Sequence, residues 1–226
     1  MSNKKTIGYE VACIMCILSN MYSDNSPSLL AYFFIFNSGR FIYGSDRLID
    51  NETIDSKESL LLSFISINSI LFYKDLSIVS PIELTVLMSY SYLKENYPFI
   101  KPFYVGFLWS ICCLYLPSLM DETSADMDNF VSLNMLTAGI SNMADIDDIE
   151  DDIMNNIITI PAKIGKKRAR VLSAGLFLGS AYLKMHHNTQ LYCTGRNARH
   201  RSWYNGRQGK FNSIRCDTEL TALNII

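Results

Sequence analysis

Seven apolar stretches run through this chain, and they constrain its fold more than any other feature. They cover residues 8–22, 27–45, 59–73, 78–94, 101–120, 129–144 and 170–183. Most are shorter than the ~20 residues that an upright spanning helix needs, so their lengths fit a polytopic membrane bundle or a soluble bundle of buried helices. Composition does not separate the two, because 49% of the 226 residues are hydrophobic and the mean hydropathy is only +0.11. The sequence predicts an all-α fold of about seven candidate helices.

The basic residues favour the membrane class. If the N-terminus is inside and every stretch crosses once, the loops between stretches on the outside contain only Lys74. The tail from Lys184 onward breaks this pattern, because by the same count it would place the following basic residues outside: Arg196, Arg199, Arg201, Arg207, Lys210 and Arg215. The loops inside contain the following basic residues: Lys4, Lys5, Arg47, Lys57, Lys94, Lys101, Lys163, Lys166, Lys167, Arg168 and Arg170. The positive-inside rule demands this distribution, whereas a soluble bundle has no reason for it. We therefore expect an integral, multi-pass membrane protein with the lipid bilayer as a partner and with no nucleic-acid partner.

Two acidic clusters lie on the same predicted side of the membrane. Asp46 and Asp50 follow one apolar stretch, and Asp145, Asp148 and Asp152 follow another. On continuing helices, spacings of three and four residues put each set on one face, where like charges repel unless a cation compensates. Mg²⁺ accepts such carboxylates when it bridges a protein to phosphate oxygens, so the clusters predict a Mg²⁺ site that binds a diphosphate. The alternative is that residues 145–152 form a solvated loop between helices, as acidic runs usually do.

The chain becomes polar and basic after the last apolar stretch. Residues 184–226 lack helical periodicity, which predicts a poorly ordered tail behind a membrane domain of residues 1–183. Four residues of this tail carry side chains that bind metals: His186, His187, Cys193 and His200. Their spacing matches no zinc pattern, so the sequence favours a polar tail over a metal site.

Three separated segments resemble the UbiA superfamily of intramembrane prenyltransferases. Residues 145–152, DIDDIEDD, are similar to the family's D-I-x-D-I-E-G-D motif, and residues 158–169 are similar to the T-L-P-V-x-x-G-x-x-x-A that follows it. Residues 46–50, DRLID, resemble the family's N-D-x-x-D-x-x-x-D, although Ile42 and Tyr43 replace its first two polar residues. Residues 97–101, YPFIK, resemble Y-P-x-x-K-R, with Pro102 in place of the arginine.

This resemblance implies a helical bundle with a lipid-open central cavity that holds a prenyl chain, and it implies roles for single residues. The catalytic ligands of Mg²⁺ would be four aspartates: Asp46, Asp50, Asp148 and Asp152. Lys101 would be the catalytic cation that faces the leaving diphosphate, with Arg47 beside it. Asp145 would support the metal ligands or help to deprotonate the acceptor. Arg40 lies within a predicted span, so we expect it to face the interior and to find a carboxylate or the diphosphate.

The function implied is Mg²⁺-dependent transfer of a prenyl group from a polyprenyl diphosphate donor to a hydrophobic, ring-bearing acceptor, aromatic in the simplest case. Family members typically have nine transmembrane helices, and this chain offers seven candidates. The alternative function is therefore a catalytically inactive, truncated scaffold that binds lipid or a partner. A soluble helical protein with acidic loops is the third reading.

Overall fold

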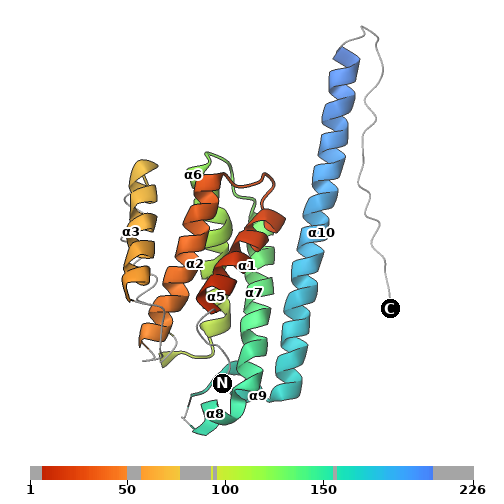
Figure 1. The fold of residues 1–226 in the computed structure, drawn as a ribbon. Helices are drawn as coiled ribbons and strands as arrows, with labels where there is room; N and C mark the ends of the chain where they lie inside the picture. Colours follow the sequence, from red (N-terminus) through yellow and green to blue (C-terminus); the bar gives the residue numbers. More distant parts are fainter. Residues whose placement is uncertain (1–6, 50–56, 77–92, 94–95, 155–156, 206–226) are drawn as a thin grey trace, which may run out of the picture. The chain divides into compact units, whose positions relative to one another are not determined.

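The computed structural model describes residues 7–49, 57–76, 93, 96–154 and 157–205, and within them it is all-α, with no strand (Figure 1). The helices are α1 (Ile7–Tyr22), α2 (Leu29–Ile49), α3 (Lys57–Tyr73), α5 (Lys101–Ser110), α6 (Leu116–Met120), α7 (Met127–Asp147), α8 (Ile149–Met154), α9 (Ile160–Ile164) and α10 (Lys166–Asn205). A π-helical turn, Ile111–Tyr115, joins α5 to α6 without a break. The predicted fold class is confirmed at this level.

Six of the seven predicted apolar stretches coincide with helices of the structure. The remaining stretch, 78–94, lies outside the described residues apart from Leu93. The boundary predicted at residue 184 falls inside α10, which continues to Asn205. The chain divides into two compact units, Met1–His187 and Asn188–Ile226, and the helices from α1 to α9 belong to the first.

Long helices that follow one another in the chain run antiparallel in the first unit. Ser28, just before α2, donates from its backbone N–H to Asp121 Oδ2 just after α6 (2.8 Å), so the beginning of α2 lies beside the end of α6. Ser132, early in α7, donates to the carbonyl of Ser180 in α10 (2.7 Å), so α7 and α10 also run in opposite directions. One end of the bundle, which we call the Lys101 end, therefore gathers the end of α2, the beginning of α5, the end of α7 and the beginning of α10. The α1–α2 and α6–α7 connections lie at the other end, which we call the Asp24 end.

A hydrophobic core joins the first helices to α7. Its buried members include Met15 of α1, Phe34 of α2, Leu71 of α3, Cys113 of the π-helical turn and Leu133 of α7. The helices approach closely where small residues face each other, as expected for packing that brings backbones together. A Cβ atom added to Gly106 of α5 would lie 2.5 Å from the carbonyl oxygen of Asn134 in α7. This core and this contact hold α5 against α7 and so position the residues at the Lys101 end.

Polar side chains lie inside the bundle, while large apolar ones lie on its surface. Fully buried or nearly buried polar residues include Ser19, Ser38, Ser63, Ser110, Ser132, Asn142, Ser173 and Ser180. Exposed apolar and aromatic residues include Ile17, Phe33, Leu62, Phe72, Val171, Leu178 and Tyr182. Several buried hydroxyls bond across helices, as Ser19 Oγ does to the carbonyl of Cys113 (2.6 Å).

One helix among the described residues is long and apolar enough to cross a bilayer. It is the continuous Lys101–Met120 helix of 20 residues. The helix Tyr9–Tyr22 is apolar but shorter. By length and composition, then, the described residues support a single membrane-crossing helix.

Candidate functional site

Lys101 and Asp145 form an ion pair between α5 and α7. Lys101 is the first residue of α5 and Pro102 follows it, where a proline is tolerated because the first backbone N–H groups of a helix have no intrahelical partner. Asp145 lies in the last turn of α7. Because the two helices are antiparallel, Lys101 Nζ reaches Asp145 Oδ1 at 2.6 Å. Two of the residues predicted from the sequence are thus brought together.

The environment of Asp145 is strongly electrostatic. Its side chain is 3% exposed, against 24% for Lys101. Burial raises the pKa of the Asp145 carboxyl, the charge and hydrogen bond of Lys101 oppose that rise, and the negative charges of Asp152 and Asp148 add to it. The net effect is a raised pKa. Asp145 is therefore electrostatically coupled to two other aspartates of the acidic run, Asp148 and Asp152, as a shared cation site would require.

Two buried oxygens on α7 lack a hydrogen-bond partner among the described residues. They are Asp145 Oδ2 and Asn142 Oδ1, which are one helical turn apart. The amide nitrogen of Asn142 donates to the carbonyl of Ala169 (3.0 Å) and to Ser173 Oγ (2.7 Å), so this side chain also ties α7 to α10. A buried acceptor without a donor is costly, and a bound cation or donor would relieve both oxygens. Sequence reasoning missed Asn142, although its position three residues before Asp145 was a usable signal.

Asp148 and Asp152 lie at a helix break. The sequence predicts that they share one face of a continuing helix, but α7 ends at Asp147 and α8 begins at Ile149. The spacing survives because the backbone N–H of Asp152 still donates to the carbonyl of Asp148 (2.8 Å). Asp148 is exposed and Asp152 is half-buried. Both carboxylates are therefore open to a ligand, while Asp145 lies beneath them.

The segment after α8 has structural roles that the resemblance alone does not indicate. Thr159 caps α9 by accepting from the backbone N–H of Ala162 (3.4 Å) and donates its hydroxyl to Asp152 Oδ2 (2.9 Å). Gly165 ends α9 with φ of 83°, a conformation that favours glycine. Ala169 is buried against Ile146. The segment thus orients Asp152 and packs α10 against the end of α7.

The first acidic cluster cannot be placed from the described residues. Asp46 and Arg47 belong to the last turns of α2, but their side chains lie outside the described part, and so does Asp50 entirely. Arg40, also on α2, has its guanidinium 4.3 Å from the centroid of the Tyr9 ring and donates to Ser59 Oγ. Among the described residues its partners are thus two aromatic rings and a hydroxyl. The sequence predicts a carboxylate or the diphosphate as the partner of Arg40, and that stays a prediction.

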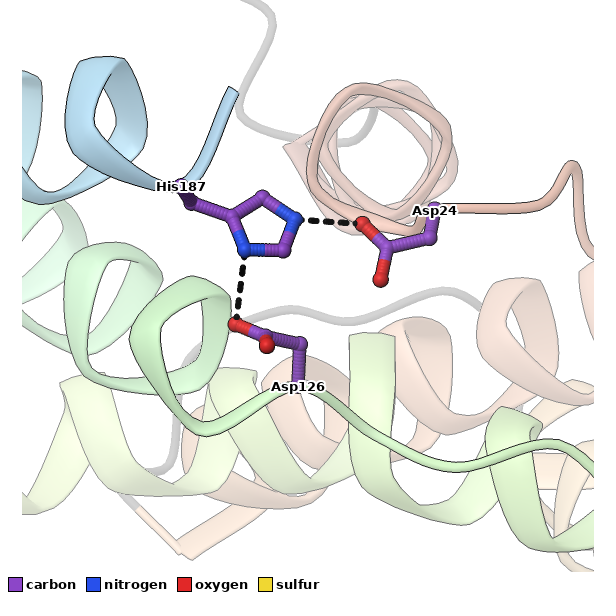
Figure 2. A group of neighbouring side chains, drawn as sticks. All are labelled: Asp24, Asp126 and His187. Carbon is purple, nitrogen blue, oxygen red and sulfur yellow. Dashed lines mark hydrogen bonds and ion pairs between the residues drawn. The ribbon is translucent and has the colours of Figure 1, made fainter. Parts of the chain in front are cut away.

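A second polar cluster occupies the Asp24 end. Figure 2 shows His187 of α10 between Asp24 and Asp126, with one ring nitrogen directed at each carboxylate. The ligand atoms of the three residues lie within 4.8 Å of one another. The sequence assigns His187 to a disordered tail and neither aspartate to any site. The signal that was missed is the topology, because the same threading puts residues 23–26, 121–128 and 184–187 on one side.

Comparison of the chain with protein-family models, with curated proteins and with solved structures finds no match. Conclusions about function therefore depend on the geometry of the site and on the motifs.

Proposed function

We propose that this protein is a multi-pass membrane prenyltransferase of the UbiA type. It would transfer a prenyl group from a polyprenyl diphosphate to a hydrophobic, ring-bearing acceptor, with Mg²⁺ as cofactor. The observation that carries the proposal is the ion pair of Lys101 with Asp145, which brings the lysine of the YPFIK segment to the aspartates of the DIDDIEDD segment. Lys101 and Asp145 are 44 residues apart in the sequence. Their contact in space is what a single diphosphate site formed by both segments would require.

The distribution of side chains supports a multi-pass arrangement. Helices in lipid associate through small residues and interhelical hydrogen bonds, because apolar side chains gain nothing by leaving the hydrocarbon. This bundle buries serine, threonine and asparagine and exposes large apolar residues such as Leu62, Phe72 and Leu178. Soluble proteins rarely expose so much apolar surface. The proposal therefore includes further membrane crossings beside the Lys101–Met120 helix.

The carboxylates at the Lys101 end fit a hard cation. Asp148 and Asp152 would hold Mg²⁺ together with Asp46 and Asp50, and the buried Asp145 Oδ2 is an acceptor that still needs a partner. When bound, Mg²⁺ supplies Lewis-acid stabilisation of the charge on the departing diphosphate oxygens. The negative charges of Asp152 and Asp148 add to the raised pKa of Asp145, and a cation at this site would reduce their mutual repulsion.

Lys101 and Asp145 have complementary tasks in this proposal. The ammonium of Lys101 has three N–H donors, and its one described partner is Asp145. The remaining donors can bind diphosphate oxygens, with Arg47 as a second cation. Asp145 acts as a positioning residue that aims the ammonium. The apolar surroundings keep water from the allylic cation, so that the acceptor attacks in its place.

An inactive scaffold that binds lipid or a partner is the second candidate function. The Lys101–Asp145 ion pair is compatible with it as well, because a buried carboxylate that neutralises the lysine would leave less positive charge for a diphosphate. The two candidates differ in turnover, which makes them separable by assay.

The test is incorporation of labelled prenyl groups by membranes that contain the full chain, with Mg²⁺, several donor lengths and a lipid extract as acceptor. We expect activity that is lost in the Asp148→Asn, Asp152→Asn double variant and retained in Glu58→Gln, an exposed control in the first turn of α3. Absence of incorporation from inserted protein with every donor would favour the scaffold. Release of the chain by alkaline carbonate washing would refute the membrane proposal itself.

A further inference from the structure

The polar cluster at the Asp24 end is built from three distant parts of the chain. Asp24 lies in the α1–α2 connection, Asp126 caps the N-terminus of α7 by accepting from the backbone N–H of Asn129 (2.9 Å), and His187 lies on α10. Since α7 has 21 residues, the cluster is about 30 Å from the Lys101 end. It is therefore separate from the proposed diphosphate site.

Both ring nitrogens of His187 face carboxylate oxygens. Nε2 lies 2.7 Å from Asp24 Oδ1, and Nδ1 lies 3.3 Å from Asp126 Oδ1. The side chain is 5% exposed, so water cannot separate these groups freely. A neutral imidazole has one N–H donor, and its other nitrogen carries a lone pair that a carboxylate repels. The carboxylates themselves are 33% and 34% exposed. A second ring proton, a bound water or a metal cation between Nδ1 and Asp126 would each satisfy this arrangement.

The two distances fit different contacts. Metal–ligand bonds of about 2.0 Å in a tetrahedral site separate neighbouring ligand atoms by about 3.3 Å, and Nδ1 and Asp126 Oδ1 are 3.3 Å apart. The 2.7 Å contact at Nε2 is too short for two ligands of one ion but suits an N–H donating to Asp24. A histidine that binds a metal through one nitrogen and donates to a carboxylate through the other is the usual arrangement in metal sites.

The surroundings leave room for an ion. Asp24, Asp126 and Asn129 line a cavity of about 50 Å³ on the side of the carboxylates, and His187 is not part of its lining. This cavity can hold waters that reach the carboxylate side of a coordination shell. Lys184, the nearest ammonium, is held by Asn129 Oδ1 (2.8 Å) and lies 5.1 Å from the centroid of the Tyr22 ring.

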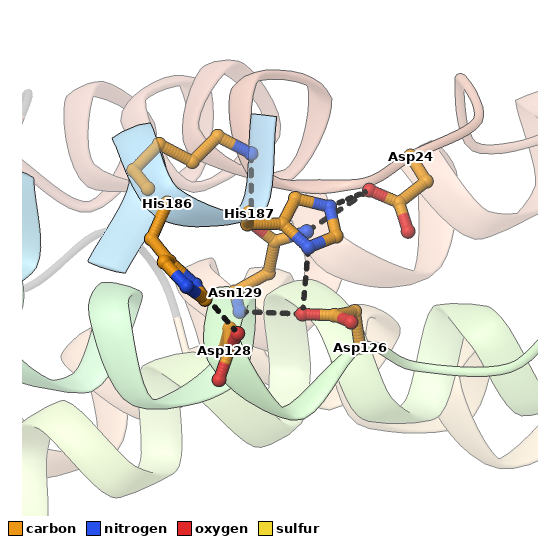
Figure 3. Close-up of polar contacts among 7 residues, drawn as sticks. Asp24, Asp126, Asp128, Asn129, His186 and His187 are labelled. Carbon is orange, nitrogen blue, oxygen red and sulfur yellow. Dashed lines mark hydrogen bonds and ion pairs between the residues drawn. The ribbon is translucent and has the colours of Figure 1, made fainter. Parts of the chain in front are cut away.

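The other charged groups around the cluster are paired or bonded elsewhere. Burial lowers the pKa of Lys184, and the charges of Asp24 and Asp126 oppose that effect. His186 and Asp128 pair with each other on the exposed side at 3.9 Å (Figure 3). Asp121, which follows α6, accepts a hydrogen bond from the hydroxyl of Ser28. Lys184 is thus the neighbouring cation that interacts with both Asp24 and Asp126, and its hydrogen bond goes to Asn129 and not to either carboxylate.

We propose that this cluster binds a first-row divalent transition ion such as Zn²⁺, with His187 Nδ1 and Asp126 as protein ligands and Asp24 as the positioning residue behind the imidazole. An imidazole ligand favours these ions over Mg²⁺ and Ca²⁺, which prefer oxygen alone. The ion would fasten α10 to the beginning of α7 and to the α1–α2 connection. The proposal does not depend on prenyl transfer.

The experiment uses the full chain in detergent, stripped with EDTA and then titrated with Zn²⁺ or Co²⁺. At about 100 times Kd we expect Zn²⁺ to raise the Tm by about 5–10 °C, and Co²⁺ to give visible absorption bands of a low-symmetry site. His187→Gln should abolish both signals, and Asp126→Asn should weaken binding strongly while keeping the helix cap. Asp24→Asn should weaken binding about 10- to 100-fold, as loss of an orienting carboxylate does. His186→Gln is the matched control and should bind normally.

Three results would overturn the proposal. The first is the absence of any Zn²⁺- or Co²⁺-dependent change in the parent chain. The second is metal binding by all three cluster variants that is as strong as that of the parent chain, which would show that the metal binds elsewhere in the chain. The third is stabilisation that acidification alone produces and that metal does not, which would identify a second proton on His187 as the cation. If His187→Gln does not fold, the two aspartate variants decide.

Discussion

Replacing Lys101 with methionine would isolate the buried charge of Asp145. Methionine keeps most of the volume of the lysine stem but removes the ammonium that lies 2.6 Å from Asp145 Oδ1. The carboxyl is 3% exposed, so water replaces this partner poorly. Breaking a buried ion pair on one side typically costs about 3–5 kcal/mol. The 24% exposure of Lys101 lowers the expectation to about 2–4 kcal/mol, because solvent already screens part of the attraction.

Protonation of Asp145 sets a ceiling on this loss. The ordinary pKa of the carboxyl is 3.8, and each pKa unit is worth about 1.36 kcal/mol. Above a penalty of about 4 kcal/mol at pH 7, the folded state would simply keep the carboxyl protonated. The double variant Lys101→Met, Asp145→Asn should regain part of the stability, since it leaves no unpaired charge.

The loss should depend on pH in a defined direction. Burial already raises the pKa of Asp145 in the folded protein, so its contribution to stability is fully present below 3.8 and is lost as the pH rises through the folded pKa. Removing Lys101 deletes the two effects that lower this pKa, and the window therefore extends to higher pH. Parent and variant should have similar free energies of unfolding in acid and should diverge as the pH increases.

The assay is unfolding by sodium dodecyl sulfate in mixed micelles, followed by far-UV circular dichroism between pH 4 and 8. Lys167→Met, at an exposed position in the first turn of α10, is the matched control and should change the free energy of unfolding by less than about 0.5 kcal/mol. A loss of stability in Lys101→Met that is independent of pH, or no greater than in the control, would refute the role assigned to the ion pair.

Three further predictions concern packing and use the same unfolding assay. Gly106→Ala should destabilise by about 1–3 kcal/mol because the new methyl group would meet the Asn134 carbonyl; Gly175→Ala, where a Cβ meets nothing within 4 Å, should be neutral or stabilising by up to about 1 kcal/mol. Asn142→Ala should cost about 1–3 kcal/mol through the two bonds lost to α10, and an unchanged free energy would show that α10 is held by other contacts. Gly165→Ala should cost about 1–2 kcal/mol through its φ of 83° alone, and a normal stability would mean that this turn relaxes.

Local features of the sequence were sufficient to predict most of the helices, but not α8, α9 or the part of α10 beyond residue 183. The stretches 8–22, 101–120 and 129–144 correspond to α1, to the helix from α5 to α6, and to α7. Such predictions succeed because a helix satisfies its own backbone hydrogen bonds and because apolar residues cluster where helices are buried or lie in lipid. The break at Asp148 was not predicted, since a change of helix axis depends on how α8 and α9 pack.

The candidate site was predictable in part. The spacing of Asp148 and Asp152 indicated that they would act together, and the backbone bond between them supports that spacing. The partners of Lys101 and Arg40 were not predictable. Lys101 pairs with Asp145, whereas Arg40 interacts with Tyr9 and Ser59, because each long side chain reaches whichever group the antiparallel packing brings near it.

The sequence by itself therefore determined the helical class, the approximate limits of the described helices as far as α7, and the acidic segment that draws attention to one end of the bundle. Only the tertiary structure brought Asp24, Asp126 and His187 together, although Asp24 and His187 are 163 residues apart in the sequence. It also left the buried oxygens of Asp145 and Asn142 without partners among the described residues. The physical reason is that helix formation depends on neighbours three and four residues away, while a site depends on which faces of distant helices pack together.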